Sequence, residues 1–247
     1  MVRPYVSVIV GAPNWQESLP LTLIDLDRDL SRREYSYEII VVCPQTAAGA
    51  RKNLNRFGLF IDHLRYAYLD FAASERALKA AGNREARGTW RLFLGEGCAA
   101  PIALFDKAIP LIKECGEVVT LDRIRARDFS FGAWWVYLEQ FVIDAVVRTY
   151  FNSRAKNFLA AEFRCFSESA ANYVFQTAAD DGPFAMIEEV LLAESAGYGV
   201  RSLRTVATKP RPRIAVKMYP ALIATLRRLR ARLGPVAKSY APELKNL

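Results

Sequence analysis

Short apolar runs, rich in β-branched residues and cut off by glycine or proline, recur along the first half of the chain. They read VSVIVGAP from Val6, YEIIVVCP from Tyr37 and WRLFLGEG from Trp90. Runs of this length and composition are typical of strands buried on both faces of a sheet. The segment after the first run carries leucines spaced by four, three and four residues, which indicates one helix face: Leu19, Leu23, Leu26 and Leu30. This alternation of strands and helices predicts an α/β fold with a mostly parallel sheet and helices on both sides.

Two later segments contain residues that are typical of the end or the start of a helix. The stretch ALKAAGNREARG, residues 77–88, is typical of a helix that closes at Gly88. The stretch AEFRCFSESAANYVF predicts a short strand leading into a helix that either Ser167 or Ser169 caps. Beyond them the chain is more helical and includes an aromatic, amphipathic segment from Phe131 to Phe151. The sequence leaves both a packed core and a lipid surface open for the aromatic run around the start of this segment, which consists of Phe129, Phe131, Trp134, Trp135, Tyr137 and Phe141.

Parallel sheets of this kind bind their ligands at the carboxyl ends of the strands. The loops at that edge are expected at residues 11–17, 43–48, 95–101 and 120–127. Cys43 ends one of the strands and could be a nucleophile, but no histidine lies near it in the sequence, which favours a buried, inert thiol.

Composition limits the classes of protein that fit. The chain has 247 residues, of which 52% are hydrophobic and 24% charged, as in ordinary globular domains. Four scattered cysteines and one histidine argue against a zinc site and favour reduced thiols in the cytoplasm. The apolar N-terminal run is too short for a signal peptide, and no stretch of about 18 apolar residues predicts a transmembrane helix.

The net charge of +8 is concentrated near the C-terminus, because the stretch 201–232 holds eight arginines and two lysines without an acid. Within it, apolar residues share one face of an expected helix: Met218, Leu222, Leu226, Leu229 and Leu233. Arginines flank that face: Arg227, Arg228, Arg230 and Arg232. A basic amphipathic helix is typical of proteins that bind an anionic membrane surface. Nucleic acid is a second possible partner, and a packed terminal helix with a solvated basic side is the third interpretation.

Several segments, taken in order, match one known pattern. They are VSVIVGAPNWQESLP, YSYEIIVVCPQT, ARGTWRLFLGEGCAAP, EFRCFSESAANYVF and LRRLRARLG. Over residues 5–235 the chain resembles family 2 glycosyltransferases of the GT-A fold, and among them the dolichyl-phosphate and polyprenyl-phosphate sugar transferases. The resemblance implies a three-layer GT-A-like domain over residues 1–212, followed by a basic amphipathic helix and tail over residues 213–247.

The resemblance also implies a function and a set of residues. A sugar would pass from a nucleotide-sugar donor to a lipid phosphate, on a cytoplasmic protein held peripherally at the inner face of the membrane. Glu188 or Glu189 would act as the base toward the acceptor, and Glu96 would hold Mg²⁺ or Mn²⁺. The nucleotide and its phosphates would be bound by Asn14, Glu17, Thr46, Arg123 and Arg164.

The chain departs from the family pattern at its carboxylates. Cys43 and Pro44 stand where the family has two aspartates, and Gly95 and Gly97 replace both aspartates of the Asp-x-Asp metal motif. These departures leave a second function open, that of an inactive homologue that binds a partner protein or a second copy of itself. A third alternative is a nucleic-acid-associated protein that uses the basic tail.

Overall fold

The structure is a computed structural model of the chain. It describes residues 3–13, 19–45, 58–70, 74–94, 102–114, 116–124, 131–155, 158, 163–206 and 216–235. For residues 121–124, 131–137, 204–206 and 216, it describes the backbone alone.

The described strands form one seven-stranded sheet in the order β3-β2-β1-β4-β6-β5-β7. Their bounds are β1 Val6–Gly11, β2 Tyr37–Pro44, β3 Leu64–Leu69, β4 Trp90–Leu94, β5 Val118–Ile124, β6 Arg164–Ser167 and β7 Val200–Val206. Among these strands, β6 alone runs antiparallel to its neighbours, β4 and β5. The predicted α/β class with a mostly parallel sheet is confirmed.

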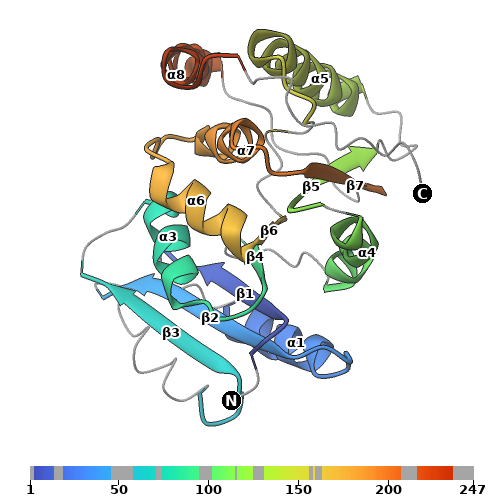
Figure 1. Cartoon of the computed structure of the whole chain (residues 1–247), viewed down its shortest axis with the longest axis vertical. Helices are drawn as coiled ribbons and strands as arrows, with labels where there is room; N and C mark the ends of the chain where they lie inside the picture. The colour runs from blue at the N-terminus through green and yellow to red at the C-terminus, as the bar shows by residue number, and fades with distance from the viewer. Residues whose placement is uncertain are drawn as a thin grey trace.

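Helices cover both faces of the sheet (Figure 1). The helices are α1 Leu19–Leu30, α3 Glu75–Glu85, α4 Ile102–Lys113, α5 Phe131–Phe151, α6 Glu168–Thr177, α7 Ala185–Ser195 and α8 Tyr219–Leu233, with a 3-10 turn, η1, at Val216–Met218. Helices α1 and α4 pack on one face and α3 and α6 on the other. Helices α5, α7 and α8 gather at one end of the molecule, away from β1, β2 and β3 (Figure 1).

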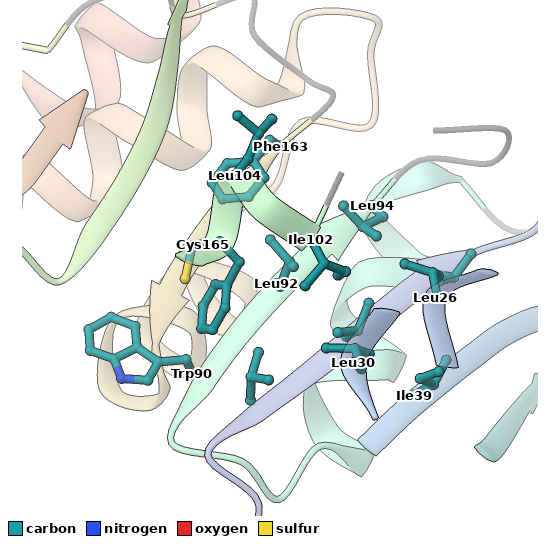
Figure 2. Close-up of a cluster of buried hydrophobic side chains, with 14 of the residues drawn as sticks. Leu26, Leu30, Ile39, Trp90, Leu92, Leu94, Ile102, Leu104, Phe163 and Cys165 are labelled. Atoms are coloured by element: carbon teal, nitrogen blue, oxygen red, sulfur yellow. The ribbon is translucent and has the colours of Figure 1, made fainter. Parts of the chain in front are cut away.

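Alternation along the strands explains why their apolar runs are nearly continuous. On β1, Val8 and Val10 join the core under α1 and α4, whereas Ile9 between them joins the core under α3 and α6. Figure 2 shows the first of these cores, where Leu26 and Leu30 of α1 lie beside Ile39 of β2. Both faces of each central strand are thus buried, as a parallel sheet requires.

The leucine face of α1 is confirmed, since Leu19, Leu23, Leu26 and Leu30 are all buried. Ser167, one of the two expected caps, accepts a hydrogen bond from the backbone N–H of Ala170 at the start of α6.

The expected helix end at Gly88 is wrong. Helix α3 ends at Glu85, and Ala86 after it is already extended. Gly88 instead lies against β1, where a Cβ atom would stand 2.7 Å from the backbone nitrogen of Ser7. Glycine is needed there for the close approach of two backbone segments.

Helix α3 approaches the sheet most closely at Gly82. A Cβ atom at this position would stand 2.3 Å from Cγ2 of Ile9 and 3.0 Å from Cγ2 of Val42, and both of those side chains are buried. We expect Gly82→Ala to lower the free energy of unfolding by about 1–3 kcal/mol through overpacking, although alanine favours the helix. Urea denaturation would measure this, with Arg84→Ala at an exposed position of the same helix as control. A G82A variant that is more stable than the wild type would contradict the close packing of Gly82 against Ile9 and Val42.

Candidate functional site

The carboxyl ends of β1, β2 and β4 meet at one edge of the sheet, where a parallel α/β fold binds its ligands. Four of the predicted site residues lie in the loops beyond these ends and outside the described residues: Asn14, Glu17, Thr46 and Glu96. For Arg123 the structure describes the backbone, which lies in β5 opposite Thr205 of β7.

A buried group of charges lies at this edge. Because β6 runs antiparallel, its first residue, Arg164, lies beside Phe93 near the end of β4. The Arg164 guanidinium donates from Nη1 to Oε2 of Glu189 on α7, at 3.1 Å. Lys79 of α3 donates from Nζ to Oε1 of the same carboxylate, at 2.9 Å. We call Lys79, Arg164 and Glu189 the carboxyl-edge ion cluster.

The guanidinium of Arg164 is committed to partners inside the protein. Besides Glu189, it donates to the backbone carbonyl of Met186 at 2.6 Å and to that of Phe158 at 2.7 Å. Its side chain is buried, so a direct contact with a nucleotide phosphate would require these bonds to break. The structure therefore gives Arg164 a positioning role, and its predicted contact with a phosphate stays a prediction that this geometry disfavours.

Glu189 is held in its ionised form. Burial by itself would raise the pKa of this carboxyl, but the charges and hydrogen bonds of Lys79 and Arg164 outweigh burial and lower its pKa below the ordinary value. A general base works best with a pKa near the operating pH. A buried carboxylate with a lowered pKa and two cationic partners is poorly suited to take a proton from an acceptor.

Glu188, the neighbouring candidate, faces a different part of the molecule. Its carboxylate accepts hydrogen bonds from the backbone N–H groups of Ala179 and Asp180, the latter at 2.7 Å, and pairs with Arg232 of α8. The structure therefore does not bring the two predicted acids together. Glu188 ties α7 to the segment before it and to α8, whereas Glu189 ties α7 to the sheet edge.

The four arginines of α8 have different surroundings. Arg228 pairs with Asp180 at 3.3 Å, and Arg232 pairs with Glu188. The guanidinium of Arg230 lies over the ring of Tyr150 on α5, 5.2 Å from its centroid, whereas Arg227 is exposed.

The apolar face of α8 is used inside the protein. Leu222, Leu226 and Leu229 are buried in a cluster with α5 and α7, and Met218 and Leu233 pack against it. This matches the third interpretation of the sequence, a packed terminal helix with a basic outer side. The apolar face of α8 is thus buried inside the protein, and any contact with a membrane would have to be made by other residues.

Sequence reasoning missed two polar groups at this edge. Lys79 stands within the helix for which the sequence analysis predicted only an end, at Gly88. Asp70, just past β3, accepts a hydrogen bond from the Gln45 side chain at 2.6 Å, next to the end of β2. A lysine placed beside the buried residues Leu78 and Ala81 was the available signal for the first. No local sequence pattern indicated the contact of Asp70 with Gln45, because this contact depends on the order of the strands in the sheet.

Cys43 is buried, and burial raises the pKa of its thiol to about 11. The thiol is therefore protonated at neutral pH, and the interpretation as an inert side chain holds.

The described carboxylates do not fit a metal site. In the ranges that the structure describes, no group of three or more metal-ligating side chains comes together. At the carboxyl edge, Glu189 is paired with two cations and Asp70 with an amide, whereas Mg²⁺ and Mn²⁺ need several available oxygen ligands. Neither of these two carboxylates is therefore available as a metal ligand.

No family model matches the sequence of this chain, and no curated protein matches it either. Solved structures do match. Glucosyl-3-phosphoglycerate synthase from Mycobacterium tuberculosis in complex with Mg²⁺ and UDP superimposes with a TM-score of 0.62 at 12% identity, over 95% of this chain and 81% of that chain. The same enzyme with Mn²⁺, UDP-glucose and phosphoglyceric acid gives 0.61 at 14% identity, over 95% and 82%. A mycobacterial protein gives 0.62 at 14%, over 95% and 76%.

This chain has a GT-A-like fold. The likeness extends over nearly its whole length and confirms the fold that the resemblance implied. At this level of identity the likeness concerns the fold alone.

Replacing Glu189 by glutamine tests the ion cluster. The change leaves a buried guanidinium without its carboxylate, so we expect the free energy of unfolding at pH 7 to fall by about 3–5 kcal/mol. Because the folded pKa of Glu189 is lowered, its contribution is present above the unfolded value near 4.5 and is lost as the pH falls through the folded pKa. The stability difference between wild type and E189Q should therefore shrink below about pH 4.5.

Glu75→Gln is the matched control for E189Q, because Glu75 also pairs with Lys79, at 2.9 Å, but is exposed. Urea denaturation at several pH values should give a change below about 1 kcal/mol for E75Q. Equal effects of the two variants would contradict a buried, coupled cluster.

Proposed function

We propose that this protein transfers a sugar from a nucleotide-sugar donor to a phosphate-bearing acceptor, and that the acceptor is a lipid phosphate of the polyprenyl type. Support for the donor class comes from the shared fold, because the matching synthase structures hold UDP or UDP-glucose. Lys79 also lies near the edge of the sheet where ligands bind in this architecture, and its ammonium is shared there between Glu75 and Glu189.

The observation that carries the choice of acceptor is the engagement of both candidate acids. A hydroxyl acceptor needs a base to take its proton. Glu189 is paired with Lys79 and Arg164, and Glu188 is paired with Arg232. A phosphate monoester has a second pKa near 6, so its oxygens are already largely ionised at neutral pH. Such an acceptor needs no protein base. This agrees with a site in which Glu188 and Glu189 are both engaged in ion pairs inside the protein.

The transfer step then requires little from the protein beyond placement. An acceptor phosphate oxygen forms a bond to the anomeric carbon as the bond from that carbon to the donor diphosphate breaks, and the electron pair leaves with the nucleoside diphosphate. Basic groups near the diphosphate stabilise its developing charge. In this proposal Lys79 and Arg123 act there, and Arg164 holds Glu189 and thereby Lys79 in position.

The remaining assignments follow the resemblance to the family. Asn14, Glu17 and Thr46 would contact the nucleoside. Glu96 would be the protein ligand of Mg²⁺ or Mn²⁺, an ion that would offset charge on the diphosphate when bound.

Calorimetric titration with UDP, GDP and their sugar conjugates tests the donor site. We expect micromolar binding of one nucleotide, weakened but not lost without Mn²⁺, because basic side chains supply part of the countercharge. Lys79→Met should weaken this binding at least about tenfold if Lys79 contributes one charge-assisted hydrogen bond. Arg84→Gln, an exposed change on the same helix, is the control. Wild-type nucleotide affinity in the K79M variant would show that Lys79 does not bind the nucleotide.

An acceptor assay tests the base-free step. With the donor found by calorimetry, we expect transfer to polyprenyl phosphate and none to the corresponding polyprenol. Phosphoglycerate serves as a soluble phosphate-bearing comparison. Transfer to the free alcohol would contradict the proposal, because it would require a base that the pairing of Glu188 and Glu189 does not supply.

The second candidate is an inactive homologue that acts as a binding or scaffolding partner. It is favoured by Gly95 and Gly97 at the metal-motif positions, together with the structural use of both glutamates. The absence of nucleotide binding up to millimolar concentration would make this candidate the better account.

A further inference from the structure

Helix α5 is apolar on its outer side as well as on its inner side. Ile143, Val147 and Phe151 are buried against α7 and α8. Beside this buried face, Val142, Val146 and Tyr150 form an exposed row at spacings of four residues, and Phe141 is exposed further round the helix, next to Val142 in the sequence. Phe141 is 71% exposed, although a helix side that faces water is normally polar.

Helix α8 borders this apolar series and extends it. The side chain of Tyr219, at the start of α8, donates a hydrogen bond to Glu139 of α5. Near the other end of α8, the guanidinium of Arg230 lies over the ring of Tyr150. Glu139, Val142, Val146 and Tyr150 follow one line along α5, so both ends of that line contact α8. Ile223, on the same side of α8 as Tyr219 and Arg230, is 49% exposed and adds to the apolar surface.

The charges around this surface are mainly positive. The acids of α5 are turned to internal partners, since Glu139 accepts from Tyr219 and Asp144 accepts from the backbone N–H of Phe158. Arg148 is exposed on the same side of α5 as Phe141, seven residues further on, and Arg227 is exposed one helical turn after Ile223 on α8. The combination of exposed aromatic and aliphatic side chains with adjacent arginines is complementary to an anionic lipid surface.

A second copy of the chain fits this surface less well. Pairing about a two-fold axis would place the arginines of both copies within one interface. The acids of α5 that could neutralise them are already engaged, as shown by Glu139 and Asp144. A membrane, by contrast, supplies the missing negative charge.

Helix α5 would lie along a bilayer and not cross it. None of the helices in the described part of the chain has the length and apolar character needed for a membrane span. Glu139, Asp144 and Arg148 interrupt the apolar sequence of α5.

We propose that α5 and α8 together form a docking surface for an anionic lipid bilayer. The exposed residues of α5 and Ile223 enter the boundary between headgroups and acyl chains, and Arg148 and Arg227 contact the headgroups. This assignment differs from insertion of the apolar stripe of α8, which is buried. It goes beyond the proposed function and does not depend on catalysis.

Co-sedimentation with lipid vesicles tests the proposal. The intact chain should pellet with vesicles of phosphatidylcholine and phosphatidylglycerol, and much less with phosphatidylcholine alone. Phe141→Ser with Val146→Ser should reduce the partition constant at least about tenfold, through lost apolar burial. Arg148→Gln with Arg227→Gln should reduce it about thirtyfold, and added salt should weaken wild-type binding more than binding of this variant.

The controls are single changes of an apolar residue and of an arginine elsewhere on the surface. Leu21→Ser changes an exposed leucine of α1, and Arg32→Gln changes an exposed arginine after α1. Both variants should pellet like wild type. Because all the changed residues are exposed, thermal unfolding of each variant should remain near that of wild type.

Three outcomes would overturn the proposal. One is a wild-type chain that stays in the supernatant with anionic vesicles. Another is undiminished pelleting of both double variants. The third is a wild-type dimer in analytical ultracentrifugation that F141S/V146S converts to a monomer without any vesicle binding, since this would assign the surface to a second copy. Nucleotide titration of the same variants separates failure of docking from failure of the proposed function, because docking variants should keep wild-type nucleotide affinity.

Discussion

A buried arginine at the carboxyl edge of the sheet needs compensation, and the second half of the molecule is arranged around that need. Arg164 occupies this place because β6 runs antiparallel between β4 and β5. An isolated buried charge is costly, so α7 supplies Glu189 and the carbonyl of Met186, while Phe158 supplies another carbonyl. Lys79 then binds the same carboxylate from α3, which ties the two halves of the fold together at the edge where a ligand would bind.

Consecutive residues of α7 contact different parts of the molecule. Glu189 faces the sheet edge, and Glu188 faces α8 through Arg232. Helix α8 is thus held by ion pairs as well as by its buried leucines. Since this packing uses up its apolar stripe, the exposed apolar series of α5 becomes the more informative feature for binding at a surface. The same commitment of acids favours an acceptor that is already ionised.

Local patterns predicted the elements of the fold well. The apolar runs beginning at Val6, Tyr37 and Trp90 are strands, and the leucine spacing of α1 gives its buried face. Gly88 was misjudged because glycine serves both helix ends and close backbone contacts, and the sequence does not distinguish them. The partners of Glu188 and Glu189 could not be predicted, because near a helix start each residue is equally compatible with solvent, a ligand or an ion pair.

The sequence by itself determined the class of fold, the two-sided burial of the strands and the amphipathic character of α8, because all of these follow from short-range periodicity. Tertiary structure alone decided what each amphipathic face meets. Hydrophobic burial is non-directional, so the leucines of α8 are equally suited to a bilayer or to α5 and α7 until the helices are placed. Likewise, Lys79 and Glu189 are 110 residues apart and meet only because the sheet brings α3 and α7 to one edge.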